Sequence, residues 1–94
     1  MDLRFTWDPA KAAANMRKHR ISFPEAVTAF GDPLSISVPD PDHSSVGEER
    51  WLLIGRTERQ RLVVVVHLEG ADVIRLISAR LATRPERKTY EEEA

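Results

Sequence analysis

Arginines that could bind phosphate recur through the second half of the chain. A guanidinium stays charged at any physiological pH, and its planar fork binds a phosphate through two parallel hydrogen bonds. Arg50 and Arg56 stand six residues apart in a segment that alternates like a strand, so both side chains would project from one face. Arg80 ends a neighbouring strand-like segment, and the three guanidinium groups could converge on one sheet surface. The alternative is that all three are solvated arginines at strand ends.

Proton transfer near neutral pH points to the histidines, because imidazole titrates closest to pH 7. His67 would lie at the end of a central strand, where a hydrogen-bonded structural histidine is the competing interpretation. His19 closes a predicted helix, and its positive charge would also favour the helix dipole. It belongs to the cationic run Lys18-His19-Arg20, which could simply be a solvated helix end.

Two further side chains leave alternatives open. Tyr90 could donate to a phosphate or stack on a base, or its ring could pack in the core. Arg75 could extend from the sheet toward solvent or pair with an acid such as Glu69.

The remaining candidates are acids and possible metal ligands in loops. Carboxylates that could act as bases lie in or beside predicted loops, where exposed acids are usual; they are Glu48, Glu49 and Glu58. Three residues of one loop have oxygen or nitrogen atoms suited to a metal ion: Asp40, Asp42 and His43. No second ligand cluster accompanies them elsewhere in the sequence, so we expect no metal site.

The elements that must position these side chains begin with helices marked by capping signals. A carboxylate before a proline, and two pairs of Ser or Thr with Glu three residues later, predict helix starts: Asp8 with Pro9, Ser22 with Glu25, and Thr83 with Glu86. The predicted helices cover residues 9–19, a short stretch between 22 and 31, and the C-terminal segment that contains Tyr90.

Between residues 34 and 79 the apolar period changes from that of a helix to that of a strand. Four strands are predicted, over residues 34–38, 50–57, 62–68 and 73–79. The third is apolar on both faces, which is typical of a central strand. Residues 5–7 could add a short edge strand or an apolar anchor. Because the connections are too short for parallel crossovers, we expect an α+β fold with N-terminal helices, a four-stranded antiparallel sheet carrying helices on one face, and a C-terminal helix.

Length and composition limit the class of protein. The 94 residues suit a single domain over residues 1–94. A net charge of −1 argues against nucleic-acid binding by bulk attraction, although arginines cluster after residue 50 and leave a local cationic face available. The absence of cysteine excludes disulfides and thiolate metal sites. The longest apolar run, 62–66, is far shorter than the ~20 residues of a membrane span, and the start lacks a signal-peptide core, so we expect a cytoplasmic protein.

Several short motifs follow one another along the chain. They read Phe5-Thr6-Trp7-Asp8-Pro9, Lys18-His19-Arg20-Ile21-Ser22-Phe23, Asp32-Pro33, Gly55-Arg56 and Leu76-Ile77-Ser78-Ala79-Arg80, followed by Glu86-Arg87 and Tyr90. Together they cover nearly the whole chain, and the ordered set, rather than any single motif, resembles the BrnT family of bacterial toxins. The resemblance implies a RelE-like fold and the toxin of a type II toxin-antitoxin system.

The same resemblance implies the activity and the partners. The toxin would be a metal-independent endoribonuclease that cleaves RNA, inhibits translation, needs no cofactor and is neutralised by a ribbon-helix-helix DNA-binding antitoxin. DNA would be contacted only through the antitoxin, and a homodimer is possible within that complex. The alternative function is a non-catalytic binding module that acts with its antitoxin as a transcriptional co-repressor. The near-neutral charge and the lack of an unmistakable acid-base pair motivate this alternative.

Cleavage of RNA without a metal needs a base for the 2′-hydroxyl, cations for the pentacovalent phosphate and an acid for the leaving 5′-oxygen. The expected catalytic residues are Arg56, Arg80 and His67. The expected RNA-binding residues are Arg50, Arg75, His19 and Tyr90.

Overall fold

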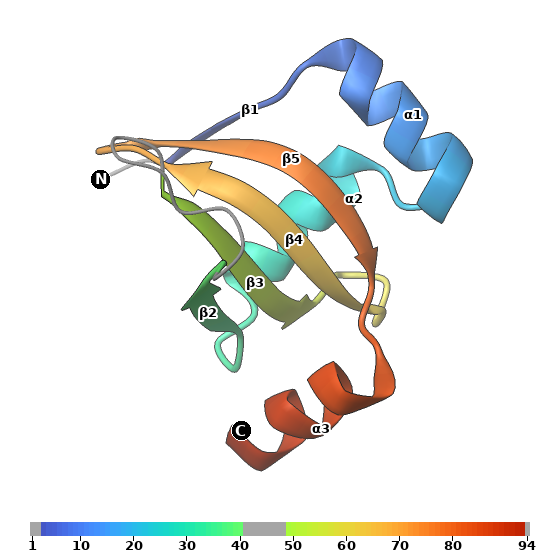
Figure 1. Ribbon diagram of the computed structural model, residues 1–94, viewed down its shortest axis with the longest axis vertical. Helices are drawn as coiled ribbons and strands as arrows, with labels where there is room; N and C mark the ends of the chain where they lie inside the picture. The colour runs from blue at the N-terminus through green and yellow to red at the C-terminus, as the bar shows by residue number, and fades with distance from the viewer. Residues whose placement is uncertain (1–2, 41–48, 94) are drawn as a thin grey trace.

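The computed structural model describes residues 3–40 and 49–93, so the predicted loop residues Asp42, His43 and Glu48 lie outside the described part. Its centre is a five-stranded sheet formed by β1 (Arg4–Thr6), β2 (Ile36–Pro39), β3 (Arg50–Arg56), β4 (Leu62–Glu69) and β5 (Val73–Leu81). The helices are α1 (Pro9–His19), α2 (Phe23–Thr28), which continues into the 3₁₀ turn η1 (Ala29–Gly31), and α3 (Arg84–Glu93) (Figure 1). The α+β class expected from the sequence is therefore confirmed.

The capping signals act where the sequence places them. The Asp8 carboxylate accepts a hydrogen bond from the Ala10 amide at 2.8 Å, and the Ser22 hydroxyl accepts one from the Glu25 amide at 3.1 Å. Before α3 the Thr83 amide donates to the Glu86 carboxylate at 2.8 Å. Within residues 3–40 and 49–93, no helix has the length and apolar composition needed to cross a membrane.

The sheet is mixed and has five strands, so the prediction of four antiparallel strands is wrong. The strand order is β1-β5-β4-β3-β2, and β1 pairs with β5 in parallel, with Phe5 opposite Ile74. The short connections do exclude parallel pairing between successive strands. They do not exclude it between the first and last strands, which are separated by residues 7–72.

Each face of the sheet packs against a helix, which corrects the expectation that all helices share one face. On one face, α2 and η1 cover a core that includes Phe23, Val63 and Val65. On the other face, Tyr90 of α3 forms a second buried cluster with Ile54, Leu62 and Val64. The central strand β4 has apolar side chains on both faces, so a helix must shield each face from water. Figure 1 shows α2 passing behind β4 and β5.

A bulge in β5 decides which of its side chains share a face. The register with β4 shifts between Val66, which pairs with Ser78, and His67, which pairs with Leu76. Ile77 is therefore the extra residue, and side chains before and after it keep the same orientation although their spacing is odd. As a result, Arg75 and Arg80 emerge from the same face of the sheet.

Candidate active site on the sheet face that carries the arginines

All four predicted arginines emerge from the sheet face opposite α2 and η1. Cross-strand partners point to the same side of a sheet. Arg50 and Arg75 are both paired with Leu68, Arg80 is paired with Val64, and Arg56 is paired with Leu62. Leu62 and Val64 face α3, which fixes the side from which the arginines leave. We call this surface the arginine face.

The arginine face holds two separate groups rather than one convergent cluster. Arg50 of β3 and Arg75 of β5 lie on either side of Leu68 of β4, so their backbone positions are two strand spacings, or about 10 Å, apart. Arg56 lies six residues further along β3 than Arg50, about 20 Å away. The Arg75 side chain is exposed and makes no hydrogen bond or ion pair with any described residue. The predicted alternative partner, Glu69, instead bonds the ring of His67.

Arg80 is held by a carboxylate from α3. Its two terminal nitrogens contact the two oxygens of Glu86 at 2.7 and 2.9 Å, the fork geometry that guanidinium also uses for phosphate. The hydrogen bond from Arg80 lowers the pKa of Glu86 to about 2. Arg80 is thus already arranged to bind an oxyanion, and Glu86 occupies that fork.

Arg56 belongs to a cluster with Tyr90 and Asp32. Its guanidinium carbon lies 5.7 Å from the centre of the Tyr90 ring, and its backbone amide donates to Asp32 at 2.8 Å. The Tyr90 hydroxyl donates to the same carboxylate at 2.7 Å, which raises the pKa of Tyr90. Burial would raise the pKa of Asp32, but the hydrogen bonds from Tyr90 and two amides lower it overall. Tyr90 is 5% exposed, so its ring packs in the core, which was the structural alternative.

His67 lies on the opposite side of the sheet from the arginines. It is fully buried, and its ring contacts Phe30 with centroids 4.9 Å apart. Both ring nitrogens are engaged, Nδ1 with the Val65 carbonyl at 3.1 Å and Nε2 with Glu69 at 3.0 Å. In this position the ring cannot reach a substrate on the arginine face. The geometry favours the structural interpretation of His67, in which it fixes the end of β4.

His19 is half-buried at the end of α1, beside β5. It lines a hollow together with Lys11 and Lys18 of α1 and with Ile77 and Ser78 of β5. Because Ser78 points to the arginine face, His19 is the described histidine that lies near this surface. The structure therefore brings His19 toward Arg80.

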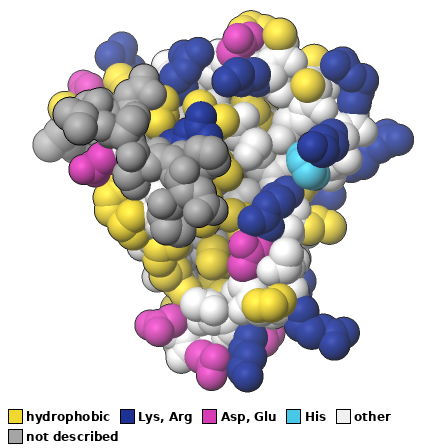
Figure 2. Space-filling model, viewed as in Figure 1, with side chains coloured by type: hydrophobic (Ala, Val, Ile, Leu, Met, Phe, Trp, Pro, Cys, Tyr) yellow, Lys and Arg dark blue, Asp and Glu magenta, His cyan; other side chains and the backbone are white. Residues whose placement is uncertain are grey.

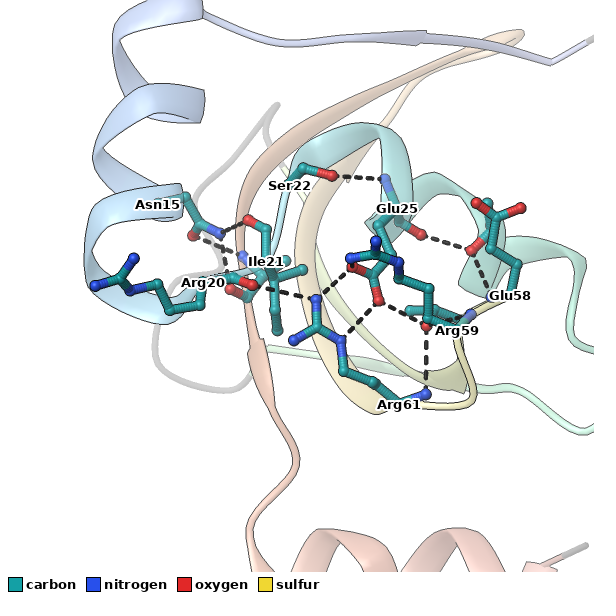
Figure 3. Close-up of polar contacts among 11 residues, drawn as sticks. Asn15, Arg20, Ile21, Ser22, Glu25, Glu58, Arg59 and Arg61 are labelled. Atoms are coloured by element: carbon teal, nitrogen blue, oxygen red, sulfur yellow. Dashed lines mark hydrogen bonds and ion pairs between the residues drawn. The ribbon is translucent and has the colours of Figure 1, made fainter.

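The sequence interpretation missed two buried polar clusters that hold the scaffold together (Figure 3). Glu25 is 6% exposed and binds the Arg61 guanidinium through both of its oxygens, with the Thr57 hydroxyl at 2.8 Å. The hydrogen bond from Arg61 lowers the pKa of Glu25. These residues are more than 30 positions apart, and no local pattern marks the contact. Only the capping position of Glu25 was readable.

Asn15 makes the second cluster, where β5 lacks a strand neighbour. Its amide nitrogen donates to the carbonyls of Ile21 and Ala79, both at 2.9 Å. Its amide oxygen accepts from the Ala79 amide at 3.0 Å. The side chain thus takes the place of a paired strand and fixes α1 to the sheet. The sequence does hold a signal for this contact, because Asn15 is a polar residue three positions after Ala12, on the side of α1 that faces the core.

Metal ligands are not gathered in the part of the chain that the structure describes. Across residues 3–40 and 49–93, no group of three or more His, Asp or Glu is placed to hold a metal ion. Asp40 is described and is buried, with its backbone amide donating to the Arg50 carbonyl at 2.8 Å.

Comparison with known proteins now gives the class of this chain. Residues 7–86 match the family described as the ribonuclease toxin, BrnT, of type II toxin-antitoxin systems. The chain belongs to this family, and the resemblance read from its motifs is confirmed. It is therefore a ribonuclease toxin whose system includes an antitoxin.

A solved structure supports the fold. The chain is similar to the crystal structure of the Brucella abortus ribonuclease toxin, BrnT, with a TM-score of 0.62 and 20% sequence identity. The match covers 87% of this chain and 99% of that chain. No curated protein sequence matches the chain.

Proposed function

We propose that this toxin is a metal-independent endoribonuclease that binds RNA on the arginine face, cleaves it and thereby inhibits translation. The observation that carries the proposal is the shared orientation of Arg50, Arg56, Arg75 and Arg80 in a chain of net charge −1. Charge gathered on one face attracts a polyanion that the chain as a whole would not. Cleavage would take place in the cytoplasm, where messenger RNA is translated.

Arg80 and Arg56 are the proposed cations for the scissile phosphate. The fork of Arg80 binds the Glu86 carboxylate through two hydrogen bonds, and a phosphate that displaces Glu86 would find the same geometry. Arg50 and Arg75 would bind the RNA backbone further along the sheet. Tyr90 supports Arg56 from beneath rather than stacking on a base, because its hydroxyl is bonded to Asp32.

Proton transfer needs a side chain that reaches the arginine face. His67 does not, since it is fully buried on the other side of the sheet. His19 lies beside Ser78, which points to the arginine face, and we propose it as the proton-transfer residue in place of His67.

Induction of the chain in a bacterial host, followed by growth and total RNA integrity, tests the activity. The Arg56→Gln/Arg80→Gln variant is expected to lose toxicity, since loss of one charge-stabilising donor costs about 10²–10³ in rate. Arg84→Gln/Arg87→Gln removes two exposed cations of α3 as a matched control and is expected to stay toxic. Thermal unfolding checks that each variant folds, because Arg80 also anchors α3. Full toxicity of a folded Arg56→Gln/Arg80→Gln variant would refute the assignment.

The antitoxin is proposed to be a ribbon-helix-helix protein that covers the arginine face, contacts DNA on behalf of the pair and brings two toxin molecules together. A RelE-like arrangement of the toxin belongs to the same proposal. Co-expression with the product of the adjacent reading frame tests these points. The complex should bind its own promoter DNA while the toxin alone does not, and growth should be restored.

A second function has one observation in its favour. His67, the most obvious acid-base residue, is fully buried, and a non-catalytic co-repressor would need no such residue at its surface. Purified protein that leaves RNA intact yet binds the neighbouring gene product tightly would establish this alternative.

A further inference from the structure

A cationic hollow of about 210 Å³ lies between α1 and β5, and its lining residue Ser78 stands two positions before Arg80 in that strand. Lys11, Lys18 and His19 of α1 form one wall, and Ile77 and Ser78 of β5 form the other. We call it the α1–β5 hollow. Its two walls come from residues far apart in the sequence, so only the folded chain assembles it.

The floor of the α1–β5 hollow is rigid. β1 pairs only with the first part of β5, from Val73 to Arg75, and leaves the later part of that edge free. Asn15 fills this position with hydrogen bonds to both the amide and the carbonyl of Ala79. These bonds hold α1 at a fixed distance from β5, so the two lysines project from a preorganised surface.

The charge of the hollow suits an anion. Among the described residues no acid lines it, and the side chains of Lys11, Lys18 and His19 make no hydrogen bond or ion pair with those residues, so their donors are available to a ligand. The hollow at Arg56 differs, because Asp32 and Glu58 line it as well. The hollow at Arg56 is therefore of mixed charge, whereas the α1–β5 hollow is cationic and is the better site for a phosphate.

The hollow is continuous with the arginine face. Ser78 pairs with Val66 and Arg80 pairs with Val64, so both side chains leave β5 on the same side, about 7 Å apart along the strand. Figure 2 shows Lys and Arg side chains gathered beside a histidine on this side of the molecule. A backbone that passes Arg80 would meet the Ser78 hydroxyl and the α1 lysines at its next phosphate.

We propose that the α1–β5 hollow binds a phosphodiester of single-stranded RNA adjacent to the phosphate at Arg80. The inference rests on the proposed ribonuclease function and assigns a subsite that sets the path of the strand. Lys11 and Lys18 supply the charge, and Ser78 supplies a neutral donor. Single strands fit this arrangement because the contacts are to the backbone and demand no paired bases.

The test measures binding of a fluorescent single-stranded 2′-O-methyl RNA, which cannot be cleaved because its 2′-oxygen is blocked. Lys11→Gln/Lys18→Gln should bind about tenfold more weakly, and the slope of log affinity against log salt should fall by about 0.7 for the one phosphate contact that is lost. Arg17→Gln/Lys88→Gln removes the same charge from exposed positions outside the hollow and should change affinity less than about twofold. All four replaced side chains are exposed, so unfolding midpoints should stay unchanged.

The outcomes separate this proposal from the ribonuclease function. If Lys11→Gln/Lys18→Gln and Arg17→Gln/Lys88→Gln bind the RNA equally well while the wild-type protein still cleaves unmodified RNA, the subsite is wrong and the ribonuclease function stands. The hollow would then be filled by solvent or by a protein partner. Wild-type protein that neither binds nor cleaves RNA would overturn both proposals.

Discussion

Replacing Glu86 by Gln removes the negative charge that Arg80 binds and keeps the size of the side chain. Gln keeps an oxygen that can accept from the Thr83 amide, so the start of α3 keeps its cap while the ion pair is lost. The pKa of Glu86 falls from 4.5 to about 2. At about 1.4 kcal/mol per tenfold change in proton affinity, this sets an upper limit of about 3 kcal/mol on the lost free energy of unfolding. Glu86 is 23% exposed and Arg80 is 35% exposed, and solvent screening reduces the expected loss to about 1–2 kcal/mol.

The pH dependence gives the prediction a second, independent check. A carboxyl whose folded pKa lies below its unfolded pKa adds stability above the unfolded value, and this stability disappears as pH falls through the folded value. The contribution of Glu86 is therefore complete above pH 4.5, reduced near pH 3 and nearly absent at pH 2. Wild-type and Glu86→Gln proteins should differ most at pH 6–7 and converge in acid.

Urea unfolding followed by tryptophan fluorescence measures the difference at pH 7, 4 and 3. Glu92→Gln removes an exposed charge from the same helix and should cost less than about 0.5 kcal/mol. The reasoning fails if the two variants are equally stable at pH 7, or if the loss in Glu86→Gln stays the same at every pH. Affinity for the 2′-O-methyl RNA should rise in Glu86→Gln, since Arg80 is then free to bind phosphate.

Three further predictions concern the scaffold. Glu25→Ala should cost about 2–4 kcal/mol in urea unfolding, because it leaves Arg61 without its carboxylate; a cost near zero would show that the pair is dispensable. Asn15→Ala should speed hydrogen exchange at the Ala79 amide and cost about 2–3 kcal/mol, and unchanged protection of that amide would contradict the strand-replacement role. Gly55→Ala should cost about 1–3 kcal/mol, because an added Cβ would lie 2.9 Å from the Ala29 carbonyl oxygen, while Gly31→Ala, with open space, should be nearly neutral.

The sequence predicts the elements of this fold well where the signal is local. Capping side chains placed all three helix starts, and the apolar pattern of residues 62–68 identified the central strand, whose residues Val63, Val64 and Val65 are fully buried. Pairing between distant segments is not a local property. The parallel contact of Arg4–Thr6 with β5 joins segments that are separated by residues 7–72, and three residues carry too little pattern to show it.

Candidate site residues were harder to predict, because a side chain of a given type serves either structure or chemistry according to the face on which it lies. His67 and Arg80 follow the same strand-like pattern, yet one is buried under η1 and the other points to the opposite face. The bulge at Ile77 sets the orientation of Arg80 relative to Arg75. A period of two, read from the sequence, does not reveal such an insertion.

The arginine face carries both stability and the proposed activity. α3 is anchored to it at two points, with Glu86 bound to Arg80 near its start and Tyr90 under Arg56 near its end. These two arginines are therefore partly occupied, whereas Arg75 and the α1 lysines make no ion pair within the described residues. RNA would first meet the free cations, and binding at Arg80 would then require phosphate to compete with Glu86. A pair that costs about 1–2 kcal/mol to break reduces RNA affinity by roughly five- to thirtyfold, so the gain in Glu86→Gln and the loss in Lys11→Gln/Lys18→Gln should be of similar size and opposite sign.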